Sequence, residues 1–83
     1  MLLTIARQYG QLADRGEGSA YPAASYYALA GSHDQALSYL ATSYTRHESD
    51  FLSARIDPRF ERLRQDPQFQ ALASRVNTSS HRN

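Results

Sequence analysis

Residues that favour β-strands are scarce in this chain, and the scarcity restricts its fold. Two Ile, one Val and four Thr stand against twelve Ala and nine Leu among the 83 residues. A sheet depends on β-branched side chains that pack on a pleated surface, whereas Ala and Leu are among the strongest helix formers. The sequence therefore predicts an all-α fold, and a chain of this length supports one small hydrophobic core.

The charge and the cysteine content narrow the classes of function. A formal net charge of +1, from nine Arg and eight acidic residues, gives no basic excess for binding nucleic acid or an anionic membrane. The chain has no Cys, which excludes disulfides and thiolate metal ligands. No stretch approaches the ~20 apolar residues of a membrane span, and the first residues lack the basic lead of a secretory signal. We therefore expect a cytoplasmic protein that binds neither nucleic acid nor membranes.

Hydrophobic periodicity predicts three helices in the first half of the chain. Residues 2–14 place apolar side chains at steps of three and four along one helical face. Residues 20–30 form a second helix that is dense in Ala and Tyr, and a third helix follows residues 32–34 and ends near His47. Because the second and third helices are joined by a tight turn at Gly31, we expect them to form an antiparallel hairpin.

Turn and capping residues mark the ends of these helices. Gly16 stands where the first helix can end in the left-handed conformation that glycine adopts without strain, and Gly31 ends the second helix. Ser19 offers a side-chain oxygen to cap the second helix, and Ser32 offers one to the third. The sequence thus predicts that the helices are capped by their own neighbouring residues.

One phrase of seven residues occurs twice in the second half of the chain. The two copies, nine residues apart, are Asp57-Pro58-Arg59-Phe60 with Leu63 and Asp66-Pro67-Gln68-Phe69 with Leu72. Asp caps the free amides of a first helical turn, Pro fits the first helical position, and Phe and Leu three residues apart anchor one face. The phrase therefore predicts two short helices in succession.

The segment before this repeated phrase is expected to be helical, and the segment after it is expected to be disordered. Ser49 opens a short helix in which Phe51, Leu52 and Ile56 are expected to point inward. Residues 77–83 lack periodicity and are expected to form a disordered tail, which leaves residues 1–76 as a single helical domain.

Five positions in the first half have the residue types and the spacing of a known helical repeat: Ala24, Tyr27, Gly31, Ala36 and Leu40. Through them the segment from Ala20 to Ser43 resembles a tetratricopeptide repeat, a helix-turn-helix unit of about 34 residues. Residues 26–37 and 56–69 are similar to the closing segment of bacterial tetratricopeptide arrays, often carried by signalling or regulatory proteins, and the similarity covers residues 19–76. Three positions depart from the repeat, since Ala20, Ser43 and Glu48 stand where a large aromatic, a small Ala and a closing Pro are usual.

The resemblance implies a protein-binding array without catalytic activity. It makes residues 2–14 the second helix of a preceding repeat, so the chain holds about one and a half repeats and short capping helices. First helices line the groove of such arrays, which implies contacts to a protein or peptide partner from Tyr21, Ser25, Ala28 and Leu29. Because about three repeats are normally needed for stability, two arrangements remain open. Either the chain belongs to a longer protein, or the apolar face of residues 2–14 docks onto another chain, including a second copy.

Arginines near the repeated phrase leave two interpretations open. Arg55, Arg59 and Arg62 can share one helical face and clamp an acidic peptide, because guanidinium groups bind carboxylates in bidentate pairs. The same arginines also fit a solvated surface that is partly neutralised by nearby acidic residues, which are Asp57, Glu61 and Asp66.

No group of residues predicts catalysis, a metal site or a cofactor site. His33-Asp34 and His47-Glu48 each pair an imidazole with a carboxylate, but they lie at opposite ends of the third helix, ~20 Å apart. They cannot converge on one ion or substrate, so capping and solvation account for them better. Tyrosines of the second and third helices could stack on bases, but Arg46 is the one arginine among them, which disfavours nucleic-acid binding.

Overall fold

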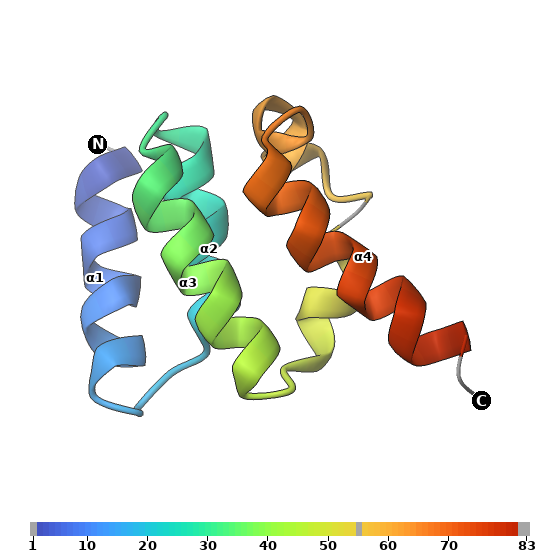
Figure 1. Cartoon of the computed structure of the whole chain (residues 1–83). Coiled ribbons are helices and arrows are strands. Elements are labelled where there is room, and N and C mark those ends of the chain that lie inside the picture. Colours follow the sequence, from blue (N-terminus) through green and yellow to red (C-terminus); the bar gives the residue numbers. More distant parts are fainter. Residues whose placement is uncertain (1, 55, 82–83) are drawn as a thin grey trace.

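The chain folds into helices throughout the residues that the structure describes, which are 2–54 and 56–81, with side chains as far as residue 74 (Figure 1). In this computed structural model, four α-helices and two short 3-10 helices follow one another. They are α1 (Leu2–Asp14), α2 (Ala20–Leu29), α3 (His33–Thr45), η1 (Ser49–Ser53), η2 (Pro58–Leu63) and α4 (Pro67–His81). The described residues contain no strand, which confirms the predicted all-α fold.

The helices are arranged as a row. α1 lies at one end, α2 and α3 form an antiparallel hairpin beside it, and α4 lies at the other end (Figure 1). α2 contacts α1, α3 and η2, whereas α4 packs against α3. The second half of the chain therefore continues the row that the hairpin begins, with η2 next to α2 and α4 next to α3.

α1 packs against the hairpin through its small residues. Ala6, Gly10 and Ala13, spaced by four and three, are the buried residues of α1. Gly10 lies under the ring of Tyr39 from α3: a Cβ at position 10 would lie 2.7 Å from the Tyr39 hydroxyl oxygen, so that side chain would have to shift. The apolar stripe that the sequence predicts for residues 2–14 is thus split into a buried side of small residues and an outer side of larger ones.

The core lies between the hairpin and the second half of the chain. Phe60, Leu40 and Leu63 are among the largest side chains that are fully buried. The ring centre of Phe60 lies 5.5 Å from that of Tyr21 in an edge-to-face contact and 5.9 Å from that of Phe69. Phe60 on η2 therefore contacts an aromatic ring of α2 on one side and an aromatic ring of α4 on the other.

Several helix ends follow the sequence prediction. Gly16 and Gly31 have φ angles of 74° and 85°, the left-handed conformation that glycine tolerates. Asp57 and Asp66 each accept the backbone N–H two residues ahead, at 3.0 and 2.8 Å. Each Asp thus caps the helix that its following proline begins, as the repeated phrase predicts.

The start of α2 is capped from a distant part of the chain, which corrects the prediction for Ser19. Ser19 and Ser32 stand at N-cap positions, but neither side chain makes a capping hydrogen bond. Instead, the carboxylate of Glu48 accepts the backbone N–H groups of Ala20 at 2.9 Å and Tyr21 at 3.0 Å. A carboxylate binds two amides at once and interacts favourably with the positive end of a helix, which a serine hydroxyl does less well.

Arg46 closes the neighbouring end of α1. Its Nη2 donates to the carbonyl of Ala13 at 2.7 Å, and its Nη1 donates to the carbonyl of Gly18 at 3.3 Å. The same Nη1 lies 3.9 Å from Oε2 of Glu48. The turn that follows α3 therefore holds the connection between α1 and α2 at both of its ends.

Two residues around η1 that the sequence places inside are in fact exposed. Phe51 is buried, as predicted, but Leu52 is 64% exposed and Ile56 is 77% exposed. A 3-10 helix has three residues per turn, so Phe51 and Ala54 share the inward side while Leu52 points outward. Ile56 lies beyond the end of η1. The prediction is wrong for Leu52 and Ile56 because it assumes an α-helical period.

α4 extends further than the sequence predicts. It begins at Pro67 and ends at His81, so the backbone is helical through residues 77–81, where the sequence predicts a disordered tail. Neither Pro nor Gly follows Pro67, and Asn, Thr and Ser lower helix propensity only moderately. Residues 82–83 lie outside the described residues.

Ser43 on α3 carries a hydroxyl that is buried without a hydrogen-bond partner among the described residues. Leaving such a group unsatisfied costs ~1–3 kcal/mol. We expect Ser43→Ala to raise the free energy of unfolding by about 1 kcal/mol, measured by urea titration with circular dichroism. Ser38→Ala, at an exposed position of the same helix, controls for helix propensity. If Ser43→Ala raises the free energy of unfolding no more than Ser38→Ala does, the expectation is wrong.

Candidate functional site

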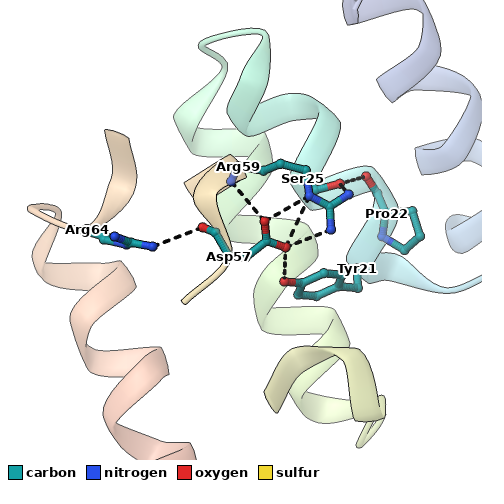
Figure 2. A network of polar contacts seen from close by, with 6 residues as sticks. All are labelled: Tyr21, Pro22, Ser25, Asp57, Arg59 and Arg64. Carbon is teal, nitrogen blue, oxygen red and sulfur yellow. Dashed lines mark hydrogen bonds and ion pairs between the residues drawn. The ribbon is translucent and has the colours of Figure 1, made fainter. Parts of the chain in front are cut away.

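Three residues with predicted partner contacts, Tyr21, Ser25 and Arg59, meet around Asp57 in a polar group that we call the Asp57 cluster (Figure 2). Tyr21 Oη donates a hydrogen bond to Asp57 Oδ2 at 2.6 Å. Arg59 Nε donates to Asp57 Oδ1 at 3.0 Å, and Arg59 Nη2 donates to Oδ2 at 2.8 Å. Arg59 Nη1 donates to Ser25 Oγ at 3.1 Å, and that hydroxyl donates to the carbonyl of Pro22 at 2.8 Å. The cluster joins the start of η2 to α2.

The charges of the Asp57 cluster are fixed near neutral pH. Hydrogen bonds from Arg59, opposed by burial and reinforced by the Tyr21 hydroxyl, lower the pKa of Asp57 to about 2. Burial and the hydrogen bond to Asp57 raise the pKa of Tyr21 well above its ordinary value. A general acid or base needs a pKa close to the working pH. The arrangement therefore suits a structural joint between elements better than proton transfer.

Burial removes most of the predicted groove contacts from solvent. Tyr21 is 3% exposed, and Ser25 and Ala28 are also buried, whereas Leu29 is 42% exposed. The reason is that η2 packs against α2 and covers the face that the repeat pattern leaves open to a partner. The predicted contacts from Tyr21, Ser25 and Ala28 are thus corrected, and Leu29 is the member of this set that keeps an exposed surface.

The predicted arginine clamp is not assembled by the described residues. Arg59 is engaged by Asp57 in a bidentate pair at 2.8 Å, so its guanidinium is not available to a peptide carboxylate. Arg62 is exposed, and Arg55 lies outside the described residues. Asp57 thus neutralises Arg59, as the interpretation of a partly neutralised surface expects.

The sequence predicts that Asp57 caps a helix and partly neutralises nearby arginines, but not that it also binds Tyr21 at the centre of the cluster. Besides the groups already described, its backbone carbonyl accepts a hydrogen bond from Arg64 Nη2 at 3.3 Å (Figure 2). One signal in the repeated phrase distinguishes the two copies. Asp57 is followed two residues later by Arg59, whereas Asp66 is followed by Gln68, which cannot form an ion pair.

The two histidines lie where the sequence places them, at opposite ends of α3. His33 begins α3, and His47 follows its C-terminal end with a φ of 60°. The described part of the chain holds no group of three or more His, Cys, Asp or Glu residues placed to bind a metal ion. Among the helices of the described residues, none is both long enough and apolar enough for a membrane span.

Partly exposed large apolar side chains gather on one side of α1. Leu2, Tyr9 and Leu12 are 39%, 38% and 39% exposed, and Ile5 is half-buried. Their spacing by three, four and three residues places these four side chains on one side of the helix. We call this set the α1 face. α1 itself lies at the end of the row of helices opposite α4 (Figure 1).

α2 extends the α1 face along one edge. The rings of Tyr9 and Tyr26 stack, with their centres 5.2 Å apart and their planes 11° apart. Leu29 lies one turn after Tyr26 on the same side of α2. Because α1 and α2 are antiparallel, this turn lies beside the N-terminal half of α1. The exposed apolar strip therefore spans two helices.

The α1 face carries no charge. The charged residues of α1 are Arg7 and Asp14. At about 100° per residue, both lie on the opposite side of the helix from the α1 face. A strip of large apolar side chains without charges is suited to pack against another apolar surface.

A concavity also lies between α3 and α4. It has a volume of about 490 Å³ and is lined by Asp34, Leu37, Ser38, Ala41, Gln68, Ala71 and Leu72. Its lining is mostly apolar, and its one titratable residue, Asp34, is exposed. We take the α1 face with its α2 edge as the candidate site, because it holds Leu2, Tyr9, Leu12 and Leu29, four of the six exposed large apolar side chains of the described residues.

Comparisons of this chain with protein-family models, with curated proteins and with solved structures find no match.

Proposed function

We propose that this chain is a non-catalytic protein-binding module of the bacterial cytoplasm, built as the terminal part of a tetratricopeptide-like array. The observation that carries the proposal is that α1 fully buries its small residues, whereas Leu2, Tyr9 and Leu12 stay 38–39% exposed. Burying a leucine or tyrosine side chain stabilises a fold more than burying an alanine. Large apolar side chains on the outside are therefore unfavourable for an isolated chain and favourable once a partner covers them.

The order of the elements supports an array. In a helical array each hairpin packs on the next, so that first helices and second helices form two rows. η2 lies next to α2, and α4 lies next to α3, which matches two such rows. On this proposal α1 is the second helix of a preceding repeat, and the α1 face is the surface on which the first helix of that repeat would pack.

The expected ligand of the α1 face is an amphipathic helix. Helices dock on apolar helical surfaces through side chains spaced three and four residues apart, which is the spacing of the α1 face itself. The described residues contain no strand, so a peptide has no sheet edge to extend here.

A photoreactive phenylalanine analogue placed at Leu12 of the full chain tests the proposal in intact cells. Leu52 is the matched control, because it is also an exposed leucine but lies on η1, outside the α1 face. We expect covalent adducts with protein from position 12 and far fewer from position 52. Equal adduct yields at the two positions contradict the proposed function.

A further inference from the structure

We infer that the partner of the α1 face is a second copy of this chain, with the two α1 helices packed antiparallel about a two-fold axis. The inference rests on the proposed function, for which it names the partner. Leu2, Ile5, Tyr9 and Leu12 follow the three-four-three spacing of a coiled-coil seam, which is the pattern of a helix that pairs with another helix.

The order of side chains along the α1 face suits pairing with itself in the antiparallel direction. In a pair centred on Arg7, Leu2 lies opposite Leu12 of the second copy, and Ile5 lies opposite Tyr9 of the second copy. A two-fold axis repeats both contacts, so one self-complementary strip serves both copies. A parallel pair would instead set Tyr9 against Tyr9 and Ile5 against Ile5, which places the two largest side chains at one level.

The charges of α1 do not oppose this pairing. Arg7 lies at the centre of the pair but on the opposite side of the helix from the seam, so it stays in solvent. Gln8, which borders the seam at the centre, is uncharged. Antiparallel helices also place the positive end of one helix beside the negative end of the other. The contact therefore buries apolar surface without burying an unpaired charge.

The size of the strip predicts a weak dimer. α1 has 13 residues and is therefore about 20 Å long. Even with Tyr26 and Leu29 at its edge, this partly exposed strip is smaller than a standard stable interface, which covers about 800 Å² per copy. We expect a weak dimer whose population rises with concentration.

Sedimentation equilibrium over about 5 to 500 µM tests the association. The mass of the wild-type particle should rise from 9.3 kDa toward twice that value as concentration increases. Leu12→Glu should weaken association about tenfold or more, because it places a carboxylate in the apolar seam. Leu29→Glu repeats the test from α2, and Leu52→Glu makes the same change at an exposed position outside the strip. Far-ultraviolet circular dichroism confirms that each variant is folded.

Disulfide trapping tests whether the two α1 helices are antiparallel. The chain has no cysteine of its own, so no other thiol competes. Leu2→Cys and Leu12→Cys are prepared as separate variants and mixed under mild oxidation. In the antiparallel pair the two thiols face each other across the seam, so the mixed disulfide should form faster than either disulfide between identical variants. Faster formation of the disulfides between identical variants overturns the antiparallel arrangement.

The outcomes separate this inference from the function on which it rests. A wild-type mass that stays at 9.3 kDa over the whole range overturns the second-copy inference. If Leu12→Glu and Leu52→Glu weaken the association equally, the second-copy inference is overturned as well. Cross-links from position 12 to a protein of another mass keep the proposed function and exclude the second copy, whereas equal cross-links at positions 12 and 52 reject both.

Discussion

Replacing Phe60 by alanine should lower the free energy of unfolding by about 4 kcal/mol. Phe60 is fully buried and contacts the rings of Tyr21 and Phe69, so truncation leaves a cavity where α2, η2 and α4 meet. A domain of this length has a total stability of roughly 4–12 kcal/mol, so the variant should lose about a third or more of it. Urea titration followed by circular dichroism measures the loss.

Two further variants make the Phe60 experiment specific. Phe60→Leu keeps most of the apolar volume and should cost less than about 1.5 kcal/mol. Leu52→Ala removes an exposed leucine and should change stability by less than about 0.5 kcal/mol. If Phe60→Ala costs no more than Leu52→Ala, the second half of the chain is not held to the hairpin by this contact.

Replacing Asp57 by alanine should lower the free energy of unfolding by about 3 kcal/mol at pH 7. The change removes the cap of η2, leaves the buried Tyr21 hydroxyl without its acceptor, and separates Arg59 from its carboxylate. The side chain of Arg59 is 41% exposed and can regain water, which keeps the loss below that of a fully buried ion pair.

Asp66→Ala is the matched control for Asp57→Ala, because Asp66 opens the second copy of the same phrase. Asp66 caps α4 in the same way, but no arginine follows it two residues later. We expect Asp66→Ala to cost about 1 kcal/mol, the usual value of an N-cap. Equal losses at positions 57 and 66 would show that the contacts to Tyr21 and Arg59 add nothing to stability.

The Asp57 cluster also makes stability depend on pH. The pKa of Asp57 in the folded chain is about 2, below its ordinary value of 3.8, so ionisation of this carboxyl favours the folded state. The resulting stabilisation, about 2 kcal/mol, is fully present above pH ~4 and is lost as the pH falls to ~2. As the pH falls from ~4 to ~2, the free energy of unfolding of the wild type should therefore drop by about 2 kcal/mol more than that of Asp57→Ala.

Local signals explain why the first three helices could be predicted from the sequence. The expected ranges 2–14 and 20–30 agree with Leu2–Asp14 and Ala20–Leu29 because apolar period, Ala content and turn glycines all act within one helical turn. The caps at Asp57 and Asp66 are local in the same sense, since each side chain reaches an amide two residues ahead.

Contacts between distant residues could not be predicted in this way. Glu48 caps a helix that begins 28 residues earlier, and Tyr21 binds a carboxylate 36 residues away. No periodicity in the sequence connects these positions. The groove prediction for Tyr21 and Ser25 is corrected for the same reason, because η2 occupies the face on which they lie. The α1 face was visible as an apolar stripe, but only the packing of Gly10 against Tyr39 shows which side of the stripe stays outside.

The adduct yield at position 12 relative to position 52, measured with the photoreactive analogue in intact cells, tests the central claim most directly. If the α1 face is a binding surface, position 12 gives discrete protein adducts and position 52 gives a weak background. If both positions give the same weak background, the large apolar side chains of α1 remain in water in the cell, and the chain does not bind protein through this face.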